Sequence, residues 1–171
     1  MKPKIQGNHE SSLSVVVINY NGGDRLLACI HAITLQSYKP RAIFLVDNAS
    51  TDHSVEAVAK TYPDVNIVRL TDNKGPSAAR NAGIAATRTD LTLLMDADIY
   101  LGKTCLQKLV LAYRQHSAVI CPRIVFYAQP ETIQCDGTSA HFIGTLILHN
   151  NLCSINEIPR KIIAVGGCPS A

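Results

Sequence analysis

Apolar segments that look like strands, each followed by a polar loop and then a segment that looks like a helix, dominate the first part of this chain. The first segment, Leu13 to Ile18, is a continuous run rich in β-branched residues, and in Asp24 to Gln36, which follows it, the apolar residues recur at helical spacing. The same order predicts strands at 42–46, 65–70 and 91–95 and helices at 54–61 and 76–87. Strands that alternate with helices form a parallel sheet covered on both faces. The sequence therefore predicts an α/β fold whose strand-to-helix loops open on one edge of the sheet.

The pattern changes in the second half of the chain. The sequence predicts a helix at 104–114, one or two strands in 118–127 with a break at Pro122, and short strands at 132–135, 140–148 and 161–165. The strands beyond Gln129-Pro130 have no helix between them, so we expect a mixed or antiparallel extension there. The last strand leads into a tight loop from Gly166 to Pro169.

Composition favours one folded domain behind a polar tail, residues 1–12. With 171 residues, of which 47% are hydrophobic, the chain is long enough to bury a core. The net charge of +3 comes from scattered Lys and Arg residues, so no nucleic-acid partner is expected. Because the tail has no signal-peptide core and no apolar stretch could span a bilayer, a cytoplasmic location is expected. Six cysteines without a C-x-x-C pair predict reduced, mostly buried thiols.

Two acids, Asp96 and Asp98, follow the strand predicted at 91–95 with one residue between them. The carboxyl ends of strands are where open α/β sheets bind their ligands. Mg²⁺ and Mn²⁺ prefer oxygen ligands and are usually held by one or two carboxylates together with substrate phosphates. The pair therefore predicts a metal–diphosphate site; the alternative is a turn with two solvated acids.

Polar residues also follow the first two predicted strands. Asn19, Tyr20 and Asn21 offer an aromatic ring for a nucleotide base and amide groups for polar contacts, although an Asn-Gly turn explains them equally well. Asp47 and Asn48 directly follow the second predicted strand, 42–46. Asp47 can accept a hydrogen bond from a base N–H or a ribose hydroxyl, and the alternative for both residues is an Asx turn.

The loop before the helix predicted at 76–87 supplies cations. Lys74 and Gly75 lie just before its first turn, where backbone N–H groups and the helix dipole favour an anion. Arg80 lies about one turn further on, among small and apolar residues. Its partner is expected to be either a ligand phosphate or a carboxylate in a structural ion pair.

In this order, the loops resemble those of a known enzyme family. The segments 14–21, 46–52, 73–84 and 95–98 resemble the nucleotide-sugar-binding half of family 2 glycosyltransferases with the GT-A fold. More loosely, 166–171 resembles the acceptor-side region of rhamnosyltransferase-like members. The resemblance implies a single GT-A domain over 13–171, with a donor-binding half at 13–100 and an incomplete acceptor-side half at 101–171.

The resemblance also implies roles for individual residues. Tyr20 and Asp47 would contact the base, Arg80 the base or the phosphates, Asp96 the ribose and the metal shell, and Asp98 the divalent cation. The implied reaction is inverting transfer of a hexosyl or rhamnosyl group from a nucleoside-diphosphate sugar to a glycan or lipid-linked acceptor. It would use Mg²⁺ or Mn²⁺ and serve polysaccharide or cell-envelope biosynthesis. The protein is also expected to associate peripherally with the inner face of the membrane.

One departure from the family concerns the catalytic base. The acids beyond Asp98 are Glu131, Asp136 and Glu157, and none lies in the family's context for that base. The sequence thus suggests a C-terminal truncation and a chain that is inactive alone. Two alternatives stay open, a sugar nucleotidyltransferase and a non-catalytic nucleotide-sugar-binding module. The first would need a glycine-rich, basic loop where 21–25 is short and acidic at its centre.

Overall fold

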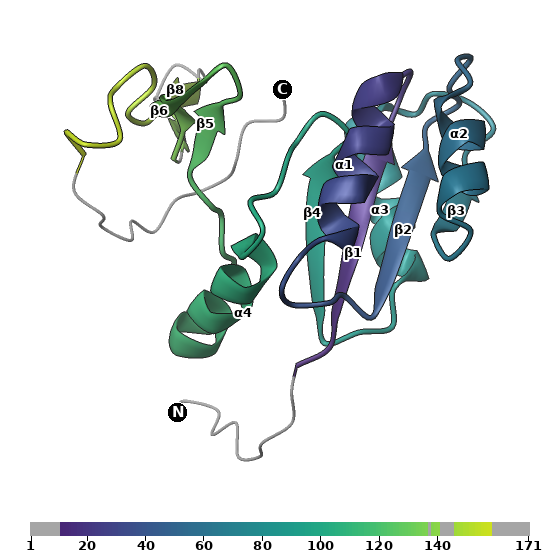
Figure 1. Ribbon diagram of the computed structural model, residues 1–171, viewed down its shortest axis with the longest axis horizontal. Helices are drawn as coiled ribbons and strands as arrows, with labels where there is room; N and C mark the ends of the chain where they lie inside the picture. The colour runs from purple at the N-terminus through teal and green to yellow at the C-terminus, as the bar shows by residue number, and fades with distance from the viewer. Residues whose placement is uncertain (1–10, 137, 141–145, 159–171) are drawn as a thin grey trace. The chain divides into compact units, whose positions relative to one another are not determined.

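The computed structural model describes residues 11–136, 138–140 and 146–158 (Figure 1). The chain divides into two compact units, one up to Val110 and one from Leu111. Each unit is described by itself. The prediction of a single domain over 13–171 stays a prediction.

The first unit is built on a parallel sheet of four strands. In spatial order, these are β3 (Asn66–Arg69), β2 (Ala42–Asp47), β1 (Leu13–Asn19) and β4 (Leu91–Asp96). All their pairings are parallel, as the alternation of strands and helices predicts. The chain moves outward from β1 to β3 and then crosses back to place β4 on the other side of β1. The order of the strands therefore reverses between β1 and β4.

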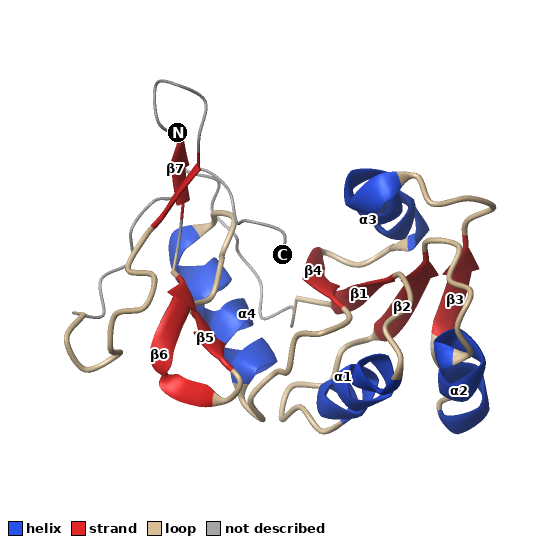
Figure 2. Ribbon diagram, turned by 90° about the horizontal axis from the view of Figure 1, so that it is seen from above, coloured by secondary structure: helices blue, strands red, loops and turns tan. Residues whose placement is uncertain are grey.

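Helices cover both faces of this sheet (Figure 2). Helices α1 (Asp24–Thr34) and α2 (Ser54–Thr61) lie on one face, and α3 (Gly75–Ala86) lies on the other. The fourth helix is α4 (Cys105–His116). Helix α1 ends two residues earlier than the sequence predicts, and the buried Gln36 beyond its end holds the start of α4 instead. The Gln36 side-chain amide donates to the carbonyl of Gly102 and accepts from the Leu106 N–H.

The continuous apolar run of β1 is explained by burial on both sides. Every residue of β1 is buried. Val15 and Val17 belong to the core formed with α1 and α2, whereas Val16 and Ile18 belong to the core formed with α3. A strand with two buried faces has no polar face, so it lacks the alternation of an exposed strand.

The second unit contains short antiparallel hairpins, as the sequence predicts. The first pairs β5 (Ile124–Phe126) with β6 (Gln129–Cys135), and the second pairs β7 (Thr138–Ala140) with β8 (Leu146–Leu148). The described residues of 118–127 contain one strand, within the predicted one or two. One detail differs from the prediction: Gln129-Pro130 opens β6 instead of separating two regions, because the chain turns back directly at 127–128. The strand predicted at 161–165 and the loop at 166–169 lie outside the described residues.

The cysteines are less buried than the sequence predicts. Cys29 and Cys135 are buried, Cys105 and Cys153 are partly exposed, and Cys121 is exposed. The expectation of mostly buried thiols is therefore wrong for the described cysteines. Among the described residues, no helix has the length and apolarity needed to cross a membrane.

Gly83 sets the distance between α3 and the sheet, which gives a first prediction. A Cβ atom at this position would lie 2.2 Å from Val16 Cγ1 and 3.1 Å from Val46 Cγ2. Both valines are buried and stiff, so Gly83→Ala should lower the free energy of unfolding by about 1–3 kcal/mol despite alanine's better helix propensity. Urea denaturation measures the change. Gly102→Ala is the control, since a Cβ there meets nothing within 4 Å. Equal stability of the two variants would contradict the close packing of α3.

Candidate functional site

The predicted site residues lie where parallel strands end side by side. In the pairing of β1 with β2, Asn19 is opposite Asp47, and in the pairing of β1 with β4, Ile18 is opposite Asp96. The strand order reverses between β1 and β4, and such a switch point is where ligands bind in open α/β sheets. The fold therefore brings the first, second and fourth polar loops to one edge, as the sequence predicts.

The Asp96–Asp98 segment forms a tight turn directly after β4. The Ala97 N–H continues the parallel pairing by donating to the Ile18 carbonyl, and the Ile99 N–H donates to the Asp96 carbonyl. Asp98 is exposed, and within the described part of the chain its carboxylate has no hydrogen bond or ion pair. The turn that the sequence offered as an alternative is thus present, and it leaves one acid open to solvent.

Arg80 is the partner of the other acid. Its guanidinium Nη2 donates to Asp96 Oδ1 at 2.7 Å. The sequence predicts either a ligand phosphate or a carboxylate as the partner of Arg80. In this structure, which contains no ligand, the partner is the carboxylate. The two side chains are 24% and 29% exposed, so a ligand at the sheet edge can reach both.

The β1–α1 loop and the β2–α2 loop are tied together by reciprocal hydrogen bonds, which we call the loop clasp. Asn21 Oδ1 accepts from the backbone N–H of Thr51 at 2.8 Å and from that of Asp52 at 3.3 Å. In the other direction, Asp52 Oδ2 accepts from the Gly23 N–H at 2.9 Å, and Ser50 Oγ accepts from the Asn21 N–H at 3.0 Å. Asn21 has a φ of 52°, which asparagine tolerates better than most residues.

Asn19 lies beneath the loop clasp and is fully buried. Its Nδ2 donates to Ser50 Oγ at 3.0 Å and to Ser54 Oγ at 3.2 Å. Its Oδ1 is buried without a hydrogen-bond partner in the described part of the chain. A Cβ at Gly22 would lie 2.3 Å from that oxygen, so a larger residue there would force the Asn19 amide to move. In this arrangement Asn19 supports the loops, and it does not present its amide at the surface.

Asp47 makes the kind of local side-chain bond that the sequence offered as the alternative, whereas Asn48 bonds to another loop. Asp47 Oδ1 accepts from the Ser50 N–H at 3.0 Å. Asn48 links its loop to the loop before α3, because Oδ1 accepts from the Lys74 N–H at 3.1 Å and Nδ2 donates to Asn73 Oδ1 at 2.8 Å. These bonds fix the position of the loops and leave Asp47 Oδ2 for a further partner.

That further partner is Arg69, a site residue that the sequence reasoning missed. Arg69 pairs with Asp47 in the β2–β3 register, and its Nη1 lies 3.6 Å from Asp47 Oδ2. Its Nη2 donates to Glu56 at 2.8 Å. Its position could have identified it. Arg69 lies near the carboxyl end of the strand predicted at 65–70, just as Asp47 lies at the carboxyl end of the strand before it.

Tyr20, Lys74 and Gly75 form the exposed part of the edge. Tyr20 is 53% exposed, so its ring is free to contact a ligand. Helix α3 begins at Gly75, with a φ of 80° and without a side-chain cap bond. Lys74 lies 3.5 Å from Asp72 in an exposed ion pair. The Gly75 N–H already donates to Asn73 Oδ1 at 3.0 Å, and Pro76 has no N–H. The first turn of α3 therefore offers an anion the exposed Lys74 cation and the backbone donors that follow Pro76.

A buried thiol lies behind the acidic turn. Cys29 Sγ is 3.9 Å from the Asp96 carbonyl oxygen. Burial, and secondarily the negative charge of Asp98, raise the pKa of Cys29 to about 12. The thiol therefore stays protonated at neutral pH when no cation is bound.

The carboxylates at this edge, Asp96 and Asp98, are suited to a metal ion that is coordinated partly by the protein and partly by a bound ligand. Within the described residues, no group of three or more His, Cys, Asp or Glu side chains could hold a metal ion. Two carboxylates at an open edge, one of them already paired with Arg80, leave most of a coordination sphere to other oxygens. That donor set matches Mg²⁺ or Mn²⁺ bound together with a diphosphate, and it does not match a caged structural ion.

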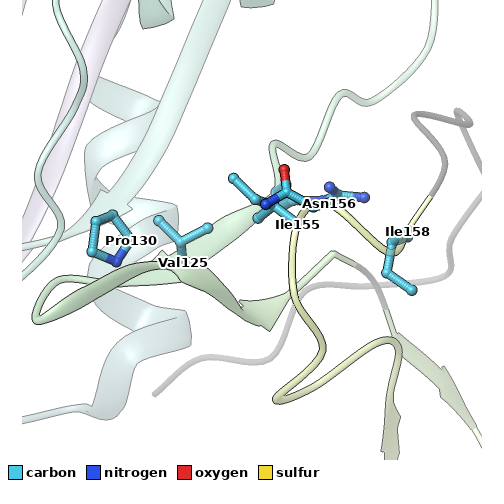
Figure 3. Close-up of a pocket in the computed structure, with 6 residues that line it drawn as sticks. Val125, Pro130, Ile155, Asn156 and Ile158 are labelled. Carbon is cyan, nitrogen blue, oxygen red and sulfur yellow. The ribbon is translucent and has the colours of Figure 1, made fainter.

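The second unit has a pocket of its own, of about 510 Å³ (Figure 3). Its lining combines the apolar side chains of Val125, Pro130, Ile155 and Ile158 with the polar ones of Arg123 and Asn156. The Arg123 guanidinium is held by Asp136, which accepts from its Nη2 at 2.9 Å.

Asp136 also accepts from Asn150 Nδ2 at both of its carboxylate oxygens, at 3.0 and 3.1 Å. An acid whose oxygens are this fully engaged is poorly suited to remove a proton from a substrate.

Comparison with known proteins assigns this chain to a family. The sequence model described as Glycosyl transferase family 2 matches residues 14–149. The chain belongs to glycosyl transferase family 2. YibD of Escherichia coli (strain K12), an uncharacterized glycosyltransferase, is 34% identical over 94 residues, which are 53% of this chain and 27% of YibD. The chain spans about a quarter to a third of the length of the first curated relatives it matches.

Solved glycosyltransferases share the fold. The mannosyltransferase PcManGT of Pyrobaculum calidifontis, in complex with GDP-Man and Mn²⁺, superposes with a TM-score of 0.59 at 24% identity, over 68% of this chain and 37% of that one. TarS of S. aureus, in complex with UDP-GlcNAc, superposes with a TM-score of 0.57 at 22% identity, over 74% of this chain and 39% of that one. At these identities the likeness shows the fold, which is the predicted GT-A arrangement.

The loop clasp makes stability depend on pH through Asp52. Slight burial alone would raise the pKa of its carboxyl, but hydrogen bonds from the Ser54 hydroxyl and from the backbone N–H groups of Gly23 and Ser54 outweigh it and lower the pKa. A carboxyl whose pKa is lowered by folding contributes stability above its unfolded pKa, and that contribution is lost as the pH falls through the folded value.

Asp52→Asn should therefore lower the free energy of unfolding at pH 7 by about 0.5–1 kcal/mol, after allowance for solvent screening. The difference from the unsubstituted protein should begin to shrink below about pH 4 and should disappear once the pH has fallen below the lowered pKa of the folded Asp52, where both proteins carry a neutral group. Urea titrations at several pH values measure it, with the exposed Asp64→Asn as the control. A difference that stays constant with pH would show that the Asp52 charge plays no part in the clasp.

Proposed function

We propose that this chain binds a nucleoside-diphosphate sugar at the carboxyl edge of β1, β2 and β4, and that it serves as the donor-binding part of a glycosyltransferase that depends on Mg²⁺ or Mn²⁺. The observation that carries the proposal is the convergence of an open carboxylate, Asp98, a partly exposed Arg80–Asp96 pair and the N-terminal turn of α3 on one sheet edge. Membership of family 2 supports it. So do the nucleotide sugars in the solved neighbours, GDP-Man and UDP-GlcNAc.

The base and the ribose are assigned to the β1 and β2 side of the edge. Tyr20 offers an exposed aromatic face against which a base can stack. Asp47 Oδ2, beside the Arg69 guanidinium, offers an acceptor for a base N–H or a ribose hydroxyl. Asn19, Asn21 and Asn48 contribute by holding these loops in place, through the bonds described above. Because the loops are fixed before the ligand arrives, less conformational entropy is lost on binding.

The diphosphate and the cation are assigned to the β4 and α3 side. Asp98 is the residue that would hold the cation, while Arg80 and Lys74 would contact the phosphates through side-chain charge. The helix that begins at Gly75 would contact them through the backbone N–H groups that follow Pro76. When bound, the cation would act as a Lewis acid that stabilises charge on the departing nucleoside diphosphate. Arg80 and Lys74 would stabilise the same charge electrostatically. Attack by an acceptor hydroxyl with inversion requires a base to remove its proton.

The proposal also covers the acceptor, the catalytic base and the location of the protein in the cell, in less detail. The engaged carboxylate of Asp136 makes it a poor base, so we assign the base to no described residue. We propose a glycan or lipid-linked acceptor, with the chain at the inner face of the membrane. The names of two relatives support a role in polymer synthesis. They are the succinoglycan biosynthesis protein ExoO of Rhizobium meliloti and the teichoic acid poly(glycerol phosphate) polymerase of Staphylococcus epidermidis.

The direct test is binding of UDP and GDP by calorimetry with Mn²⁺ and with a chelator. The unsubstituted chain should bind more tightly when Mn²⁺ is present. Asp98→Asn should remove this gain, a loss of more than about tenfold in affinity, because the variant has lost the open carboxylate of the turn after β4. Asp64→Asn, an exposed acid between α2 and β3, is the matched control and should behave as the unsubstituted chain does. Equal nucleotide affinity with Mn²⁺, with chelator and in the Asp98 variant would overturn the assignment.

A further inference from the structure

The two acids of the turn after β4 are not equivalent, because only one of them has a counter-ion. Arg80 Nη2 lies 2.7 Å from Asp96 Oδ1, whereas Asp98 is exposed and has no ion pair within the described residues. The Asp96 charge is therefore already neutralised. A divalent cation that approached Asp96 in this state would meet the positive guanidinium beside it.

Arg80 is also placed to leave this pair. It lies one turn into α3, whose first turn presents backbone N–H groups at the same edge, and its side chain is 24% exposed. A guanidinium binds a carboxylate and a phosphate with the same fork of donors, so a diphosphate at this edge competes for it directly.

We propose, on the basis of the function proposed above, that Arg80 is an exchangeable counter-ion. In the nucleotide-free protein it holds the Asp96 carboxylate and keeps a free divalent cation weakly bound. When a diphosphate takes over the guanidinium, Asp96 becomes available to the cation. Cation and nucleotide then bind with positive coupling, because each favours the state in which Arg80 has left Asp96.

The experiment measures Mn²⁺ binding to the full chain without nucleotide, from the loss of the free Mn²⁺ electron paramagnetic resonance signal. Arg80→Met should bind Mn²⁺ more tightly by at least about tenfold, because Asp96 is freed and a positive charge is removed. Arg80→Lys should stay near the unsubstituted protein, because it keeps the charge. Arg88→Met removes an exposed cation just beyond α3 and controls for the change in net charge.

The double variant Arg80→Met with Asp96→Asn gives the sharpest result. It removes the ion pair as a neutral unit, so its affinity for Mn²⁺ alone should return to the level of the unsubstituted protein. If Asp96 ligates the cation without nucleotide, the double variant should instead lose affinity, and the proposal fails. It also fails if Arg80→Met binds Mn²⁺ no more tightly than Arg88→Met does.

The coupling provides a second readout. The factor by which UDP or GDP tightens Mn²⁺ binding should be smaller in Arg80→Met than in the unsubstituted protein, and an unchanged factor would overturn the exchange. Failure of the proposed function looks different: Asp98→Asn would leave metal-dependent nucleotide binding intact, whatever the Arg80 variants do. Thermal melts of each variant confirm folding, and replacing a partly buried pair with neutral side chains of similar size is usually well tolerated.

Discussion

Parallel pairing of β1 with strands on both of its sides is the constraint on which the site depends. Because β1 has β2 on one side and β4 on the other, Asn19 is opposite Asp47 and Ile18 is opposite Asp96. Polar loops that are far apart in the sequence therefore begin at neighbouring points. The apolar run of β1, buried on both faces, fixes this arrangement, since a shift of register by one residue would exchange the residues of its two cores.

The polar loops at this edge hold one another. The loop clasp joins the loop after β1 to the loop after β2, and Asn48 joins the latter to the loop before α3. Five backbone N–H groups thereby have partners without ligand, those of Asn21, Gly23, Thr51, Asp52 and Lys74. Among the described residues, the groups left open or exchangeable include the Tyr20 ring, the Asp98 carboxylate and the Arg80 guanidinium. We propose that these groups recognise the donor, while the asparagines beneath them provide the rigid support.

The strands, the helices of the first unit and the edge that carries the site could be predicted from the sequence, because hydrophobic periodicity and strand order are local signals. The partners of the site residues could not. The contact of Asn21 with Thr51 and Asp52 exists only because β1 and β2 are adjacent, and the Arg80–Asp96 pair depends on the crossover that brings β4 beside β1. Arg69 was missed because its relation to Asp47 arises from the β2–β3 register. In the second half the strands are short, and Gln129-Pro130 looked like a break although it opens β6.

The most direct test of the account is a crystal structure of the chain with Mn²⁺ and UDP or GDP, with the anomalous signal of manganese recorded. The account predicts a manganese peak beside the Asp98 carboxylate, a diphosphate bridging it to the first turn of α3, and a base against the Tyr20 ring. A nucleotide bound elsewhere, such as in the pocket lined by Val125 and Ile155, or a manganese peak away from Asp98, would contradict it.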